Sequence, residues 1–211
     1  MGRATLLVLT AAALYGQDAL KERALGEQLT KELTARTTAV ETPDVVNYVN
    51  RIGRLLAPQF RPGIQWTFAV IVDDNNGKMH EPIAYPGGYI FVSTALLREA
   101  QSEGELAGMM AHAMAHVALR QGRMHGTAPV IFLGGSGNES AIVPTGMLAQ
   151  MRQGELEADQ AAAKALVNAR YDALEFVNYI RRTQPETANA LPPRDQRIAA
   201  LERTVRELVQ R

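Results

Sequence analysis

The stretch AHAMAHV, residues 111–117, carries two histidines, His112 and His116, four positions apart. The capping pattern Ser102-x-x-Glu105 precedes it, and mostly small or apolar residues follow, so the sequence predicts a helix from Glu103 to about Arg120. Residues i and i+4 of a helix share one face, where two imidazoles can reach one metal ion at about 2.0–2.1 Å. The alternative is a hydrogen-bonded histidine pair on a half-buried face, and the spacing alone leaves both open.

Two carboxylates farther along the chain are candidates to complete a metal site. Glu155 and Asp159, in the segment GELEAD (154–159), are again four residues apart. Glu155 could be a third ligand, and Asp159 could accept the outer N–H of a ligand histidine and fix its tautomer. The alternative is a solvated acidic helix start, whose carboxylates complement the helix dipole. The chain has no cysteine, so any metal must be bound by His, Asp or Glu.

Position 113 departs from the pattern that such a helix usually carries. In the H-E-x-x-H signature of zinc peptidases, a glutamate follows the first histidine and acts as the general base. Here that residue is Ala113. Another carboxylate could replace the base, and the candidates are Glu81, Glu103 and Glu157, although the sequence places none of them beside the histidines.

The remaining patterns predict an α+β fold. An alternating segment from Ile64 to Val72 indicates a strand, followed by a turn signal at Asn76-Gly77. We expect two further extended segments, on either side of Pro86-Gly87-Gly88, and a long loop over 122–146. Strands come early and helices late, so we expect a small antiparallel or mixed sheet packed on the histidine helix and a helical C-terminal half. The extended segments are residues 79–85 and 89–93, and the other expected helices begin at residues 43, 154, 172 and 194.

The first residues have the character of a signal peptide. An early cation, Arg3, precedes an apolar run from Ala4 to Leu14, which predicts a cleaved signal over residues 1–16. The protein is then exported, to the bacterial periplasm or out of the cell. The alternative is a buried N-terminal helix.

Beyond the signal we expect a helical segment over residues 17–42, solvated over most of its length, and a folded domain over residues 43–211. No later segment reaches the roughly 18–20 apolar residues of a membrane span, although membrane contact stays open. The 22 basic and 22 acidic residues give a net charge of 0, without a basic block, so the sequence does not indicate nucleic-acid binding.

Three segments together resemble the HtpX/Oma/CAAX-protease type of gluzincin zinc metallopeptidase. They are IAYPGGYIFVSTALLREAQSEGELAGMMAHAMAHVALRQG (83–122), RQGELEADQAAAKALVNARYDALEF (152–176) and LPPRDQRIAAL (191–201). The resemblance runs from about residue 64 to the end. It implies zinc as the cofactor and an extended or unfolded polypeptide as the partner. The residues that it assigns are His112, His116 and Glu155 as zinc ligands, Asp159 as their support, and Tyr89, Ile90, Phe91, Val92 and Ser93 as the sheet edge that pairs with substrate.

The departures from the family pattern bear on activity. Ala113, natural or introduced, replaces the base, and Gln121 and Leu191 stand where histidines are common. We expect residues 43–211 to be a metallopeptidase-like domain that is nearly inactive as written. An active enzyme would need the glutamate restored at position 113 or another base. The alternatives are a non-catalytic pseudopeptidase that acts as a peptide-binding or chaperone-like module, and a helical structural protein without metal.

Overall fold

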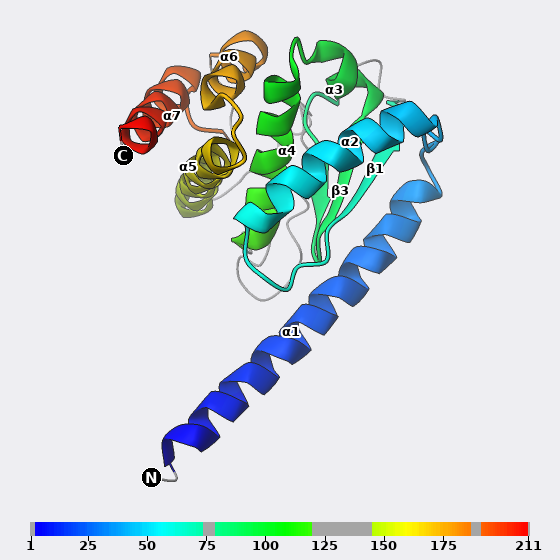
Figure 1. The fold of residues 1–211 in the computed structure, drawn as a ribbon, viewed down its shortest axis with the longest axis vertical. Helices are drawn as coiled ribbons and strands as arrows, with labels where there is room; N and C mark the ends of the chain where they lie inside the picture. The colour runs from blue at the N-terminus through cyan, green and yellow to red at the C-terminus, as the bar shows by residue number, and fades with distance from the viewer. Residues whose placement is uncertain (1–2, 74–78, 120–144, 187–190, 211) are drawn as a thin grey trace.

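The computed structural model describes residues 3–73, 79–119, 145–186 and 191–210, without the side chains of residues 3–18 and 145–147. The turn predicted at Asn76-Gly77 and most of the loop predicted over residues 122–146 lie outside these residues. Figure 1 shows a helix, α4, between a small sheet and a group of C-terminal helices. The elements are α1 (Arg3–Thr34), α2 (Pro43–Leu56), η1 (Ala57–Gln59), β1 (Thr67–Ile71), β2 (Ile83–Tyr85), β3 (Tyr89–Ser93), α3 (Thr94–Glu99), α4 (Glu103–Ala118), α5 (Thr145–Asn168), α6 (Ala173–Thr183) and α7 (Arg194–Val209). The α+β prediction is confirmed.

The sheet is mixed, with strand order β1-β3-β2. The Pro86-Gly87-Gly88 turn needs its glycines, since Gly87 and Gly88 have φ of +80° and +100°. The turn folds β3 back antiparallel to β2, and the other side of β3 pairs with β1 in parallel. Residues 89–93 are therefore the central strand, and the expectation that they form a substrate-binding edge is wrong.

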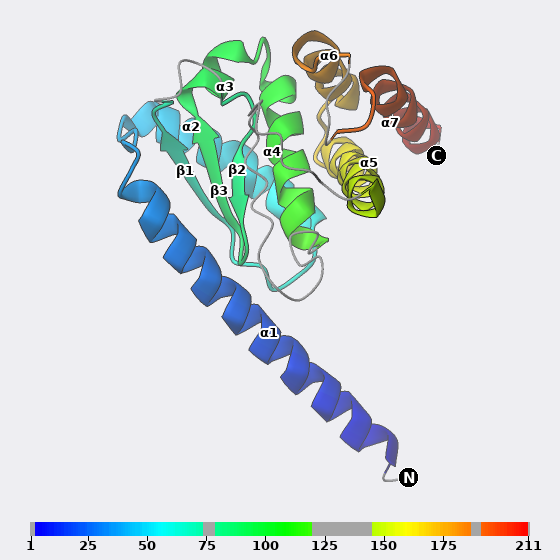
Figure 2. The same ribbon diagram turned by 180° about the vertical axis from the view of Figure 1, so that it is seen from behind.

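The free edge of the sheet belongs to β2. Thr38 to Val40 cover the outer edge of β1, where the Val40 amide donates to the Val70 carbonyl and the Val72 amide to the Thr38 carbonyl, both at 2.8 Å. Among the described residues no strand pairs with the outer side of β2. Because α4 packs beside β2, this edge lies on the side of the sheet that carries the histidine helix (Figure 2).

The two faces of the sheet are buried by different helices. Alternate residues of a strand point to opposite faces. One face packs in the main core with α2 and α4, and its residues are Phe68, Val70, Ile90 and Val92. The other face carries Ile71, Ile83, Tyr85, Tyr89 and Phe91 and packs against Leu25, Leu29 and Leu33 of α1. The sequence predicted a helix that is solvated over most of its length, but the second half of α1 is docked on the sheet.

Burial on all sides makes α4 the centre of the fold. Every residue from Gly104 to His116 is buried, and a helix that is apolar around its whole circumference requires such a place. Its start follows the prediction, since the Ser102 hydroxyl accepts a hydrogen bond from the Glu105 amide at 3.1 Å. Among the described residues no helix is both long and apolar enough to cross a membrane.

Candidate metal centre

One face of α4 carries small residues and then the two histidines. Gly104, Gly108, His112 and His116 follow one another at four-residue spacing. A Cβ at Gly108 would lie 2.5 Å from Cβ of Phe176, so the glycine allows α6 to pack closely on this face. Phe176 also lies beside the His112 ring, with centroids 5.9 Å apart. The glycines therefore let α6 approach the same face that presents the histidines.

The acidic residues reach the histidines from α5. Glu155 and Asp159 are buried, with 4% and 1% of their surface exposed, so they are not a solvated acidic helix start. Ala158 and Ala162 on the same helix are fully buried. Such small side chains permit a close approach of α5 to α4, and this brings the carboxylates to the imidazoles.

The ligand atoms have the spacing that a tetrahedral metal ion needs. The Nε2 atoms of His112 and His116 are 3.0 Å apart, and Glu155 oxygens lie 3.3 Å and 3.5 Å from them. Two ligands of a tetrahedral ion at about 2.0–2.1 Å are separated by about 3.4 Å. Two imidazole nitrogens and a carboxylate this close in a buried site need a shared proton or cation between them, so the arrangement fits zinc.

A buried charge network holds the outer side of His112. Its Nδ1 lies 2.9 Å from Oδ1 of Asp159, which leaves Nε2 directed at the ligand cluster. Arg197 of α7 donates to both oxygens of Asp159, at 2.6 Å and 2.8 Å, and to Gln184 Oε1 at 2.9 Å. The guanidinium also lies 3.4 Å from the His112 ring nitrogens. Asp159 of α5 and Arg197 of α7 thus both contact the imidazole that α4 presents, and Gln184 holds Arg197 in place.

The sequence patterns assigned no role to Arg197, although it lies in the segment LPPRDQRIAAL (191–201). The signal was its spacing, since Arg197, Leu201 and Val205 share one face of α7 and are the buried residues of that helix. A charged residue that continues an apolar stripe is rarely buried without a partner. Here the partner is Asp159.

The charges of the network determine its protonation. Burial disfavours the charged form of His112, but hydrogen bonds to Asp159 and Glu155 outweigh burial and raise its pKa to about 9. Burial also disfavours ionised Asp159, yet Arg197 and the bond from His112 lower its pKa to about 2. The pKa of Glu155 is also lowered, because the bond from His112 and the positive charges of His112, His116 and Arg197 together outweigh the effect of burial. The metal-free site thus holds a proton where a metal ion would bind.

We expect opposite pH dependences for stability and zinc binding. The raised pKa of His112 stabilises the metal-free chain. This contribution is complete below pH 6.5, the ordinary pKa of histidine, and is lost as the pH rises through about 9. The lowered pKa of Asp159 contributes fully above 3.8, and its contribution is lost as the pH falls toward about 2. Zinc must displace the His112 proton, so its apparent affinity should rise about tenfold per pH unit from pH 7 to 9. Urea unfolding with a chelator present, and zinc titration over the same range, measure both trends. A pH-independent affinity would contradict them.

Ala113 and the three alternative carboxylates lie in different surroundings. Ala113 is 3% exposed and packs in the main core. Glu103 binds Arg51 and Tyr171 at the start of α4, and Glu157 is exposed on α5. Glu81, just before β2, interacts electrostatically with the site. Burial raises the pKa of its carboxyl group, while Arg197 and then His112 lower it.

The comparison with protein families agrees with this geometry. The model of peptidase family M48 matches residues 45–128 and 120–205. The chain belongs to peptidase family M48. Peptidases of this family depend on zinc, and His112, His116 and Glu155 are the described residues whose ligand atoms lie together, within 4.8 Å of one another.

Relatives of this M48 chain include proteases of Gram-negative bacteria. A Vibrio cholerae serotype O1 protein, provisionally named a beta-barrel assembly-enhancing protease, is 28% identical over 196 residues, which are 82% of this chain and 40% of the relative. The beta-barrel assembly-enhancing proteases of Yersinia pestis and Escherichia coli K12 are each 24% identical, over 82% and 77% of this chain and 40% and 37% of the relatives. The chain therefore spans about 40% of the length of these curated relatives.

Proposed function

We propose that the chain is a zinc peptidase domain that holds an extended polypeptide beside α4 and hydrolyses it slowly, because Ala113 replaces the usual base. The observation that carries the proposal is the buried cluster of His112, His116 and Glu155, with ligand atoms at metal-binding separations. These three residues would hold the ion. Zinc, when bound, supplies a Lewis acid that polarises the scissile carbonyl and acidifies a water molecule.

The free edge of β2 suits an extended polypeptide. A peptide that pairs with Ile83–Tyr85 would gain main-chain hydrogen bonds without a requirement for particular side chains. Since α4 packs beside β2, the same peptide would pass the histidines. Unfolded or loosely folded segments are therefore the substrate class that we propose.

A second candidate function follows from Ala113 itself. Alanine removes no ligand, so the domain can retain zinc and the peptide-binding edge while hydrolysis is lost. The chain would then be a pseudopeptidase that binds unfolded protein, in the manner of a chaperone. Binding of labelled unfolded casein without cleavage, even after a glutamate is placed at position 113, would favour this function.

Metal analysis tests the zinc binding on which both candidate functions rest. The purified chain should retain about one zinc ion after dialysis, and His116→Ala should lose it, because a ligand atom disappears from the cluster. Glu157→Gln is the matched control, since Glu157 is exposed on the same helix as Glu155. Retention of zinc by His116→Ala would refute the proposed ligand set.

We also propose export to the periplasm or beyond the cell. The support is the apolar run after Arg3. Fractionation of cells that express the chain, with N-terminal sequencing of the product, tests it. An uncleaved chain in the cytoplasmic fraction would contradict export.

A further inference from the structure

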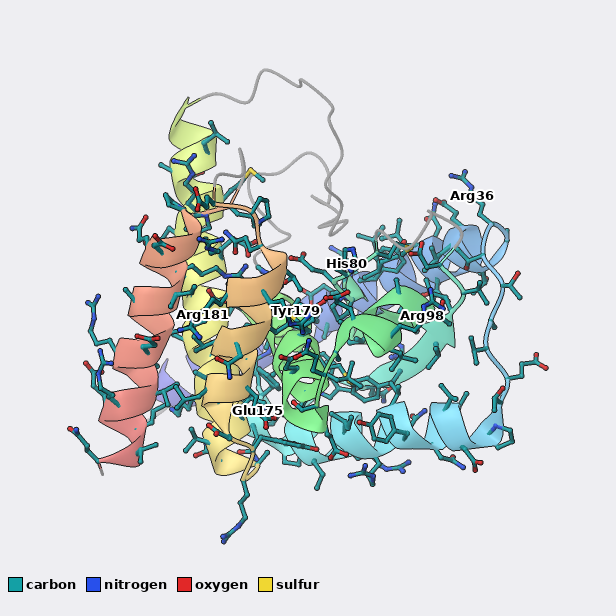
Figure 3. All side chains as sticks on the ribbon, turned by 90° about the horizontal axis from the view of Figure 1, so that it is seen from above. Arg36, His80, Arg98, Glu175, Tyr179 and Arg181 are labelled. Carbon is teal, nitrogen blue, oxygen red and sulfur yellow. The ribbon has the colours of Figure 1, made fainter. Side chains whose placement is uncertain are left out.

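The segment that leads into β2 is held firmly against the core. The Ser93 hydroxyl donates to the Met79 carbonyl, and the Met79 amide donates to Asp73 Oδ2 at 3.3 Å. Tyr179 of α6 donates from its hydroxyl to the His80 carbonyl at 2.6 Å, and Figure 3 shows these two residues side by side. Pro82 and Ile83 are buried directly after it. Glu81 therefore has a fixed place between anchored neighbours.

The carboxyl group of Glu81 is coupled to the metal site. Arg197 and His112 attract its charge, and Glu155 and Asp159 repel it. The charge of Glu81 also helps to raise the pKa of Tyr179, whose hydroxyl holds the segment that contains Glu81. Its ligand atoms are not part of the close cluster of His112, His116 and Glu155. Strand β2 packs against α4, and Tyr179, which binds the residue before Glu81, lies one turn of α6 after Phe176 at the His112 ring. Glu81 thus lies on the β2 side of the site, as a neighbour of the ligands rather than as one of them.

The other two candidate carboxylates are used elsewhere. Glu103 is nine residues before His112, which is about 13 Å along a helix, and Arg51 and Tyr171 bind its oxygens. Glu157 accepts a hydrogen bond from Gln153 and is exposed. Of the three carboxylates that could replace the base, Glu81 is the one beside the site.

The net charge of the zinc-loaded site also favours a third carboxylate beside it. A zinc ion and Arg197 would bring three positive charges into a buried region, where Glu155 and Asp159 supply two negative charges. A glutamate at position 113 would balance them, but alanine does not. The charge of Glu81 makes the sum zero. Buried charges are stable only when they are compensated, so the carboxylate has a place in the metal-loaded site.

We propose that Glu81 is the general base of this domain in place of residue 113. The inference rests on the proposed peptidase function. The Glu81 carboxylate takes a proton from the attacking water as the water oxygen bonds to the scissile carbonyl carbon. It then gives that proton to the amide nitrogen as the C–N bond breaks, which leaves a carboxyl group and an amine without any redox change.

Glu81→Gln tests the inference, because glutamine keeps the size of the side chain and removes its charge. The residual zinc-dependent cleavage of labelled casein should fall about tenfold or more. Zinc affinity, measured by competition with a chromophoric chelator, should fall about tenfold, as is usual when a carboxylate near a metal is lost. Glu157→Gln is the control and should change neither quantity. Thermal unfolding of both variants checks that the fold is retained.

The same substitution in the variant Ala113→Glu tests the role of Glu81 separately from the peptidase function on which it rests. In Ala113→Glu, where a base is restored, adding Glu81→Gln should lower cleavage less than about twofold. Cleavage and zinc affinity that Glu81→Gln leaves unchanged in the Ala113 chain would overturn the role of Glu81, as would an Ala113 chain without measurable cleavage beside an active Ala113→Glu. An Ala113→Glu chain that binds zinc and remains inert would instead overturn the peptidase function.

Discussion

Replacing Ala113 by glutamate is expected to raise zinc-dependent cleavage of casein by about 10²–10⁴-fold, the usual contribution of a positioned base. Residue 113 directly follows the ligand His112 on α4, which is the position of the base in the H-E-x-x-H signature. The gain should lie toward the lower end of this range, because Glu81 already supplies a carboxylate near the site. The measurement is the initial rate of casein cleavage at equal zinc occupancy.

Ala113→Gln is the matched control for this gain. It adds the same volume to the core at position 113 and cannot accept a proton, so it should remain at the rate of the original chain. Both variants place a polar group where alanine is 3% exposed, so both should unfold at lower temperature without zinc. Equal rates for the two variants would show that residue 113 does not act as a base here.

The ligand positions could be predicted because they follow from local spacing. His112 and His116 share a helix face by periodicity alone, and the same holds for Glu155 and Asp159. That the two pairs meet depends on the packing of α4 against α5. This packing rests on alanines and glycines whose significance appears only when two helices are seen together. The family resemblance supplied that step.

What the sequence did not reveal depends on contacts between distant segments. The resemblance assigned residues 89–93 to a sheet edge, and the periodicity of β3 alone does not show that β1 pairs with its other side in parallel. The coupling of Glu81 to Arg197 joins residues 116 positions apart in the chain. Neither residue has a neighbour in sequence that would indicate this electrostatic coupling.

Arg197→Met is expected to destabilise the metal-free chain by about 3–5 kcal/mol, because it breaks the buried ion pair with Asp159 and leaves that carboxylate only the bond from His112. Asp159 is 1% exposed, and the two hydrogen bonds from Arg197 compensate its charge. Methionine keeps much of the apolar length of the side chain, so the loss reports mainly on charge. Urea unfolding followed by circular dichroism, with a chelator present, gives the free energy of unfolding.

The control for this loss is Arg206→Met on the same helix, where the arginine side chain is 64% exposed and the change should cost less than about 0.5 kcal/mol. The double variant Arg197→Met/Asp159→Leu should recover much of the stability, since removing both buried charges is far less costly than removing one. It should nevertheless bind zinc about 10–100-fold more weakly, because His112 loses the carboxylate that orients its ring. Recovery of stability together with unchanged zinc affinity would mean that Asp159 and Arg197 serve only the fold. A loss of zinc affinity in a stable double variant would instead establish that the buried pair positions the ligand.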